Sequence, residues 1–337
     1  RQWTSASESQ TLTQSPPIPI SGLNRADCLY DARALALEWV NRGSRMASTV
    51  TAAFTEFASR LELTANQRSD AQTKHVGVKD CLETKYDVST AFLQGSYARS
   101  TMIRPPCDLD LFVVFAGSHF GASPSAILQQ VHDCLKATYV NTPIRKDRPA
   151  VNLDFATIGF DVVPAFAYGQ NYVIPSPFAD LWITTNPKRH QDITAAINEA
   201  TGGSFVPLVK MFKQWNRCNY SRLTGFHLEV ALGLAWPRES TLLTAPRYGT
   251  FPSAADASAV LLERLADQLA YQVDDPAGLS GRIDTYLTAD DRKRARACLL
   301  DDAAEAQIAL RHQARGNHAS AINKWRAIFG DEFPAFS

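Results

Sequence analysis

The segment CDLDLFVVF places two carboxylates at the start of a very apolar run. Asp108 and Asp110 are two residues apart, so on a β-strand both side chains point to the same face. Residues 111–115 are apolar on both faces, which is typical of a central strand that is covered on both sides. The segment therefore predicts a buried sheet with a charged pair at the N-terminal end of one strand.

The surrounding sequence predicts a mixed α/β lobe between helical segments. Strands are expected at 112–115, 150–157 and 160–166, with a helix over 124–139. Apolar residues at helical spacing predict one long helix from residue 26 to Leu61, broken near Gly43, and a second over about 65–84. The Pro-rich stretch after Tyr172 and the Thr- and Pro-containing stretch 238–253 are expected to be loops. Further helices are expected at 191–200, 205–216, 226–235, 257–271, 288–315 and 319–329.

A third acid and a glycine-serine pair point to phosphate chemistry. Asp161 starts a second apolar run, GFDVVPAF, and an adjacent strand would place it about 5 Å from the first pair. Gly95 and Ser96 lie upstream at an expected helix start, where backbone N–H groups favour anions. Lys210 and Lys213 are three residues apart, so one helix face could present both to a shared anion.

Three clustered carboxylates repel one another unless cations compensate their charge. Oxygen ligands suit Mg²⁺, with Mn²⁺ as the alternative, and two such ions could activate a hydroxyl and hold a triphosphate. In this reading Asp161 accepts the proton of the hydroxyl. A strand that merely begins with polar residues is the simpler alternative. A phosphatase-type aspartyl nucleophile is excluded, because its acids follow the apolar strand, whereas here they precede it.

Composition excludes several other classes of protein. Lys and Arg together number 34, as do Asp and Glu, and this balance argues against an obligate nucleic-acid ligand. No apolar run approaches the roughly 20 residues that a membrane span needs, and the first residues lack a secretory pattern. The six cysteines are scattered without CxxC spacing, so free thiols in a cytoplasmic protein are expected rather than a zinc site.

Together, the motifs QGSYARST, CDLDLFVVF and FDVVP resemble those of the polymerase-β-like nucleotidyltransferases, in the branch of cyclic-GMP-AMP synthase and its bacterial relatives (the cGAS/DncV-like nucleotidyltransferases). The resemblance extends through IPSPFADLWITTNP, LVKMFKQWNR, FHLEVALG and AINKWRAIFGDEFP, and it covers roughly residues 28–335.

This resemblance implies an α+β fold with a mixed sheet, a long spine helix and a helical C-terminal lobe. The expected parts are a flexible arm over 1–25, a catalytic lobe with the spine helix over 26–190, and the helical lobe over 191–337. The implied site comprises metal ligands and nucleotide-binding residues: Asp108, Asp110 and Asp161 for metal, and Gln94, Gly95, Ser96, Lys210, Lys213, Thr224 and Phe226 for the nucleotide.

Some of these roles have structural alternatives. Phe226 could stack on a base or simply pack in the core, and Gly225 stands where many members have a hydroxyl residue, which weakens the role of Thr224. His227 and Glu229 are expected to be structural. Arg99 could meet a phosphate or form a salt bridge at the surface.

The activity implied by the resemblance is synthesis of a cyclic di- or trinucleotide second messenger from nucleoside triphosphates, with two Mg²⁺ ions. Family members serve bacterial antiphage signalling with a separate effector, and a regulatory partner protein is expected. Two alternatives stay open: a synthase of linear oligonucleotides or tails, and a non-catalytic nucleotide-sensing module.

Overall fold

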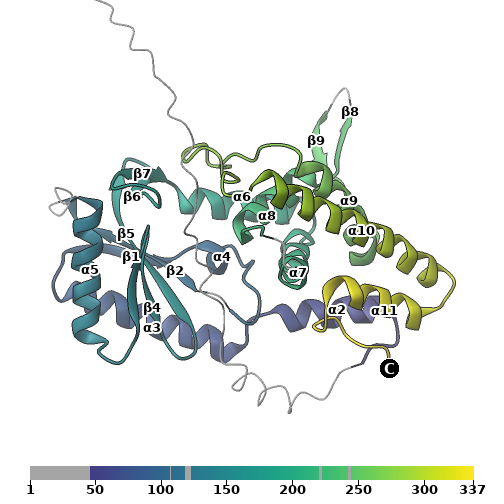
Figure 1. Cartoon of the computed structure of the whole chain (residues 1–337), viewed down its shortest axis with the longest axis horizontal. Coiled ribbons are helices and arrows are strands. Elements are labelled where there is room, and N and C mark those ends of the chain that lie inside the picture. The colour runs from purple at the N-terminus through teal and green to yellow at the C-terminus, as the bar shows by residue number, and fades with distance from the viewer. Residues whose placement is uncertain (1–45, 107, 118–122, 220–221, 242–243) are drawn as a thin grey trace, which may run out of the picture. The chain divides into compact units, whose positions relative to one another are not determined.

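The computed structural model describes residues 46–337 apart from 107, 118–122, 220–221 and 242–243 (Figure 1). The predicted arm over 1–25 and the predicted helix over 26–45 lie outside the described residues. Of the six cysteines, Cys28 and Cys107 also lie outside them, and the four others are free thiols, as expected. No helix among the described residues is long and apolar enough to cross a membrane.

Two consecutive helices form the spine. α2 (Val50–Leu61) buries Phe54 and Phe57, and α3 (Ala65–Glu83) follows after a break of three residues. The break occurs because Thr64 caps α3. The Thr64 hydroxyl accepts a hydrogen bond from the backbone N–H of Gln67, and the Gln67 side-chain oxygen accepts one from the backbone N–H of Thr64. The second predicted spine helix is confirmed. Residues 46–49 are not helical, so the first one starts only at Val50 in the described part.

A seven-stranded mixed sheet follows, in the order β1-β2-β5-β4-β3, with β6 pairing both β5 and β7. β2 and β5 run parallel, and every other neighbouring pair in this sheet is antiparallel. The α+β fold class is thereby confirmed. The strands are β1 (Val88–Leu93), β2 (Leu109–Phe115), β3 (Ile144–Asp147), β4 (Ala150–Asp154), β5 (Gly159–Tyr168), β6 (Asn171–Pro175) and β7 (Trp182–Thr185).

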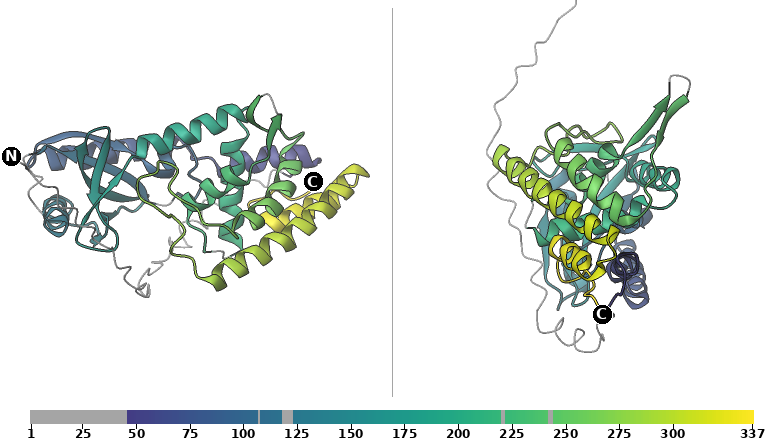
Figure 2. Two further views of the ribbon diagram at one scale, coloured as in Figure 1. Left: turned by 90° about the horizontal axis from the view of Figure 1, so that it is seen from above. Right: turned by 90° about the vertical axis from the view of Figure 1, so that its right-hand side faces the viewer.

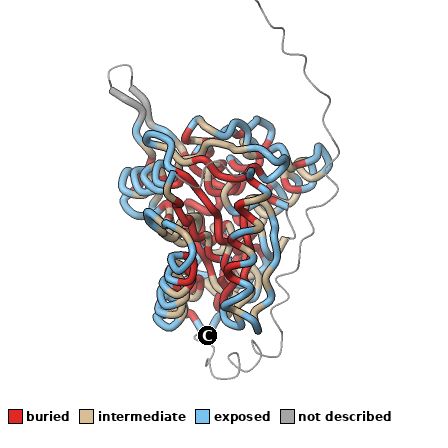
Figure 3. The backbone as a smooth tube through the Cα atoms, turned by 90° about the vertical axis from the view of Figure 1, so that its left-hand side faces the viewer, coloured by how far each residue is buried: buried red, intermediate tan, exposed pale blue. Residues whose placement is uncertain are grey.

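The two faces of this sheet differ in their cover. α3 and α5 (Pro124–Thr138) pack on one face, where the odd-numbered residues of β2 are fully buried. The opposite face carries a smaller apolar cluster built around Phe112, Val163 and Ile174. Figure 3 shows buried backbone running through the interior, with exposed segments at the periphery.

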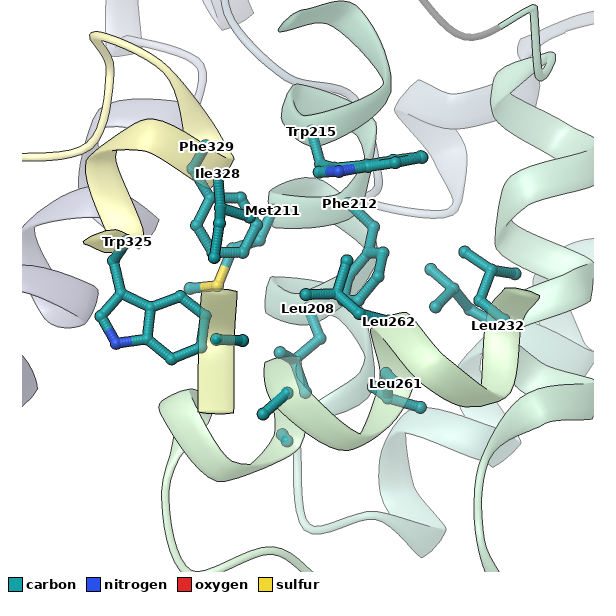
Figure 4. Close-up of a cluster of buried hydrophobic side chains, with 14 of the residues drawn as sticks. Leu208, Met211, Phe212, Trp215, Leu232, Leu261, Leu262, Trp325, Ile328 and Phe329 are labelled. Atoms are coloured by element: carbon teal, nitrogen blue, oxygen red, sulfur yellow. The ribbon is translucent and has the colours of Figure 1, made fainter. Parts of the chain in front are cut away.

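Helices dominate the rest of the chain. They are α6 (Pro187–Ala200), α7 (Phe205–Cys218), α8 (Gly225–Ala235), α9 (Ala254–Gln268), α10 (Ala289–Ala314) and α11 (His318–Phe329). α7 lies at their centre, with Trp325 and Phe329 of α11 on one side of it and Leu261 and Leu262 of α9 on the other (Figure 4). α2 packs into this same core, although the predicted boundary places it in the catalytic lobe.

Both long loops predicted here were wrong in part. The stretch after Tyr172 contains the end of β6, all of β7 and the start of α6. The stretch 238–253 contains a hairpin of β8 (Arg238–Thr241) and β9 (Thr244–Tyr248), which projects from the helices in Figure 2. In both cases Pro and Thr suggested loops, but short edge strands and hairpins tolerate such residues.

The C-terminal tail is tied to the start of the described chain. Ala47 donates to the Ala335 carbonyl over 3.0 Å, and Ser337 donates to the Ala47 carbonyl over 3.2 Å. Phe333 is fully buried beside Phe54 and Phe57. The tail therefore belongs to the core around α2.

Candidate active site

The three predicted carboxylates meet on one face of the sheet. β2 and β5 are parallel neighbours, and Asp110 is paired directly with Asp161 in their register. Asp108 lies two residues before Asp110 and hence on the same face. The predicted placement of Asp161 beside Asp110 is confirmed by this register, because neighbouring strands lie about 4.8 Å apart. Asp108 precedes β2, and its charge contributes to the raised pKa of Asp161.

Two glycines lie directly against these acids. A Cβ atom at Gly95 would overlap Oδ2 of Asp110, and a Cβ atom at Gly159 would overlap Oδ1 of Asp108. Gly95 also has a φ of +65°, a conformation that side chains disfavour. The two carboxylates therefore pack against bare backbone, and no other residue type fits at either glycine without moving them.

The electrostatics of the acids reflect their crowding. Burial raises the pKa of Asp161 to about 7, and the charges of Asp108 and Asp110 add to the rise. Burial likewise raises the pKa of Asp110 to about 6, although the nearby Arg99 partly offsets it. The pKa of Asp108 is raised too, by burial and then by Asp154. Ionising all three acids together is therefore unfavourable, and the neighbouring Arg99 and Lys213 offset this only in part at Asp110.

The oxygen atoms of these acids bear on whether the site suits a metal ion. Among the described residues, no three Asp, Glu, His or Cys side chains lie as a group that could hold a metal ion. However, no described side chain donates a hydrogen bond to Asp108 or Asp110, so their oxygens are available. Crowded carboxylate oxygens without such donors suit a hard divalent cation whose remaining ligands come from water and substrate phosphates. The donor set therefore fits.

The glycine-serine pair forms a short turn beside the acids. α4 (Gly95–Ala98) is one turn long, Gln94 precedes it, and the Gln94 N–H donates to the Asp110 carbonyl over 2.8 Å. The Ser96 carbonyl accepts from Thr101 and Met102, which closes the loop that follows. The first amides of a helical turn have no acceptor within it, so those of Ser96 and its neighbours can receive an anion.

The two predicted lysines, Lys210 and Lys213, lie at different places in the structure. Lys213 of α7 donates to both the carbonyl and the hydroxyl of Thr101, at 3.0 Å each, and so lies beside the segment that follows α4. Lys210 is buried and pairs with Glu62 at the break between α2 and α3. Of the two predicted lysines, the structure brings only Lys213 to the glycine-serine turn.

The two residues predicted at the start of α8 already have protein partners. Thr224 caps the helix, its hydroxyl accepting from the His227 N–H over 3.3 Å. The guanidinium of Arg99 lies 4.8 Å from the ring centroid of Phe226, and the ring of His190 lies 4.9 Å from it. A base could stack on Phe226 only where these groups leave its ring accessible, and this role stays a prediction.

The structural role expected for His227 agrees with its contacts. Its Nδ1 lies 2.9 Å from the hydroxyl of Tyr286, and burial lowers its pKa to about 4. The ring is therefore neutral near pH 7.

Glu229 links the turn to the helices, a connection that the sequence did not reveal. Its buried carboxylate accepts from Arg99, Thr101 and Thr194 at 2.8 Å each and lies 3.6 Å from the ammonium of Lys213. Arg99 is therefore a salt-bridge partner, but a buried one, whereas the predicted alternative was a salt bridge at the surface. A lone acid in the apolar run LEVALGLA was the available signal.

Asn152 was also missed. It lies on β4, paired with Asp161 in the register of β4 and β5, and its amide donates to the Asp161 carboxylate. The sequence VNLD offers only an amide in an apolar strand, which is weak evidence on its own.

A separate cavity of about 510 Å³ lies between α2 and the starts of α7 and α9. None of the described residues that line it is ionisable, and none is a predicted site residue. The acids, and not this cavity, are therefore the centre of any metal-assisted chemistry.

Comparisons with known proteins agree with this geometry. Residues 48–198 match the Second Messenger Oligonucleotide or Dinucleotide Synthetase domain. The chain is 28% identical over 317 residues to the cyclic AMP-AMP-AMP synthase of an Acinetobacter species, covering 87% of this chain and 88% of that protein. It is 28% identical over 153 residues to the cyclic UMP-AMP synthase of Rhodothermus marinus, covering 36% of this chain and 52% of that protein.

Solved structures share the fold. CdnC of Escherichia coli MS115-1 with ATP superposes with a TM-score of 0.67 at 15% identity, covering 85% of this chain and 99% of that one. The cyclic AMP-GMP synthase DncV of Vibrio cholerae, in complex with a linear intermediate, gives 0.67 at 12% identity, covering 86% and 97%. In its matched domain, its curated relatives and its fold, the chain is similar to the cGAS/DncV-like nucleotidyltransferases of the polymerase-β-like superfamily.

Proposed function

We propose that this enzyme joins nucleoside triphosphates into a cyclic di- or trinucleotide, using two Mg²⁺ ions held by Asp108, Asp110 and Asp161. The observation that carries the proposal is the pairing of Asp110 with Asp161 in the register of β2 and β5, and the hydrogen bond from Lys213 to Thr101, in the segment after α4, supports it. The family match and the cyclic-nucleotide synthases among the relatives support the same activity.

Each group has a defined task in this proposal. Bound cations would polarise the acceptor hydroxyl and offset the charge of the triphosphate. The backbone amides around Ser96 and the ammonium of Lys213 would bind the phosphates from two sides. Asp161, with a pKa raised to about 7 by burial and the neighbouring acids, is suited to take the proton of the attacking ribose hydroxyl near neutral pH.

The substrates and partners follow from the relatives. ATP is the substrate to test first, because a relative that covers 87% of this chain is a cyclic AMP-AMP-AMP synthase. The product would act as a second messenger in bacterial antiphage signalling. A regulatory protein partner is part of the proposal, since CdnC forms a complex with a HORMA protein.

The product identifies the reaction. The enzyme is incubated with α-³²P-labelled nucleoside triphosphates and Mg²⁺, or Mn²⁺ in parallel, and the products are treated with phosphatase and examined by mass spectrometry. A cyclic product has no terminal phosphate and therefore retains all its label after phosphatase treatment. A linear product loses the label on its terminal phosphate, and this loss would identify the enzyme as a linear synthase.

The control for this assay is Asp108→Ala combined with Asp110→Ala, which should abolish the product. Glu305→Gln, on an exposed ion pair with Lys324, should leave it unchanged. Unaltered product formation by the double variant would contradict the proposed site.

A further inference from the structure

Asn152 completes a row of polar side chains across three neighbouring strands. Asp110 on β2 is paired with Asp161 on β5, and Asp161 is paired with Asn152 on β4. Directly paired residues of adjacent strands project from the same face of a sheet. The amide therefore lies on the face that carries the acids, next to Asp161 and on its far side from Asp110.

The contact between Asn152 and Asp161 fixes which way the amide points. Nδ2 of Asn152 donates to Oδ1 of Asp161. The reverse orientation would place the amide oxygen against a carboxylate oxygen, and an ionised carboxylate only accepts hydrogen bonds. The other end of the amide, Oδ1, is consequently buried and has no hydrogen-bond partner among the described residues.

Packing does not account for an amide at this position. Asn152 is 7% exposed, and its neighbours Val151 and Leu153 are fully buried apolar residues of the same strand. An apolar side chain of similar size would fill the space without leaving a buried acceptor unpaired. A buried, half-satisfied amide of this kind is typical of a site whose polar groups serve function.

We infer that Asn152 is a positioning residue for the reaction, acting through Asp161. This inference rests on the proposed function, in which Asp161 binds a cation and takes the proton of the attacking hydroxyl. The amide holds one carboxylate oxygen, which fixes the rotation of the carboxylate and leaves the other oxygen to face the cation and the hydroxyl. Residues that orient metal ligands in this way typically contribute 10- to 100-fold to metal affinity or activity.

The test compares Asn152→Leu with a matched control. Leucine is close to asparagine in size and removes both the donor and the unpaired acceptor; Asn152→Ala is a second variant in case leucine disturbs folding. The control is Asn171→Leu on β6 of the same sheet, where the Asn171 side chain accepts from Asn186 over 2.9 Å, away from the acids. Mn²⁺ binding by electron paramagnetic resonance, the thermal midpoint, and kcat and KM are measured for each protein.

We expect Asn152→Leu to weaken Mn²⁺ binding by about 10- to 100-fold and to lower kcat by a similar factor. The KM for nucleoside triphosphate should stay within about threefold of that of the unaltered enzyme, because the phosphate-binding groups are untouched. The thermal midpoint should match that of Asn171→Leu. Wild-type Mn²⁺ affinity and kcat in both Asn152 variants, with only a lower midpoint, would show that the residue is merely structural.

Asp161→Asn separates this inference from the proposed function on which it rests. If Asp161→Asn retains activity and Mn²⁺ binding, the role proposed for Asp161 fails. If Asp161→Asn loses both while the Asn152 variants keep them, only the inference about Asn152 fails.

Discussion

Replacing Glu229 with glutamine removes the charge on which the junction between the glycine-serine turn and the helices depends. The carboxylate is 3% exposed, and the Arg99 and Lys213 side chains around it are 7% and 10% exposed. Breaking a buried ion pair by removing one partner costs about 3–5 kcal/mol, because the remaining charge stays buried without compensation. Domains are stable by only about 5–15 kcal/mol, so the loss should be large.

Urea denaturation followed by circular dichroism measures this loss as the shift of the midpoint multiplied by the slope. The matched control is Glu305→Gln, whose ion pair with Lys324 has side chains that are 40% and 38% exposed. Exposed pairs contribute about 0–1 kcal/mol, so this variant should stay close to the wild type. A Glu229→Gln protein that also stays within 1 kcal/mol would refute the reasoning.

The pH dependence of the difference gives an independent check. Burial alone would raise the pKa of Glu229, but Arg99 and Lys213 outweigh it and leave the pKa below its ordinary value. A lowered carboxyl pKa contributes stability that is present above the unfolded value of about 4.3 and is lost as pH falls through the folded value. The stability gap between wild type and Glu229→Gln should therefore be constant from pH 6 to 8 and shrink below about pH 4.

Three further predictions concern the site itself. Gly95→Ala should lower the free energy of unfolding by about 1–2 kcal/mol, because Gly95 has a left-handed backbone conformation, and urea denaturation measures this loss. The added methyl group should also displace Asp110 and nearly abolish turnover, which the product assay measures. Lys213→Ala should raise the KM for nucleoside triphosphate by about 10- to 100-fold, which corresponds to the loss of one charge-assisted hydrogen bond. Lys210→Ala should lower only the thermal midpoint. Equal KM values for the two variants would contradict the different locations of the two lysines. Burial and the neighbouring acids raise the pKa of Asp161 to about 7, so the metal-free protein should lose stability as pH rises from about 4 to about 7 and change little above that. Mg²⁺ affinity measured by calorimetry should fall about tenfold per pH unit below 7. A flat profile would be inconsistent with that pKa.

The placement of the acids was predictable because it depends on local pattern. Alternation within a strand puts Asp108 and Asp110 on one face, and a second apolar run beginning with Asp161 suggests a neighbouring strand of matching register. Periodicity likewise gave the cores of the helices, whose observed ends differ from the predicted ones by a few residues. These features need no knowledge of which distant segments meet.

The remaining features depend on contacts between distant parts of the chain. Lys210 and Lys213 have the same spacing signal, but Glu62, 148 residues away, binds Lys210 and leaves only Lys213 at the turn. Glu229 and Asn152 are single polar residues in apolar elements, and their partners are known only once the strands and helices are assembled. Short strands such as β3, with the sequence IRKD, lack an apolar pattern because they lie at the exposed edge of the sheet.

Gly159, the glycine that contacts the Asp108 side chain, bears on how relatives of this enzyme should be classified. Gly159 has an ordinary backbone conformation, so its replacement would not disturb the strand by itself, yet any side chain there would occupy the space of the Asp108 carboxylate. A natural sequence with all three aspartates intact and a larger residue at this position should therefore encode a protein that folds normally without catalysing nucleotidyl transfer. Surveys that count only the acids would score such a pseudoenzyme as active, and inspection of this one glycine would separate the two groups.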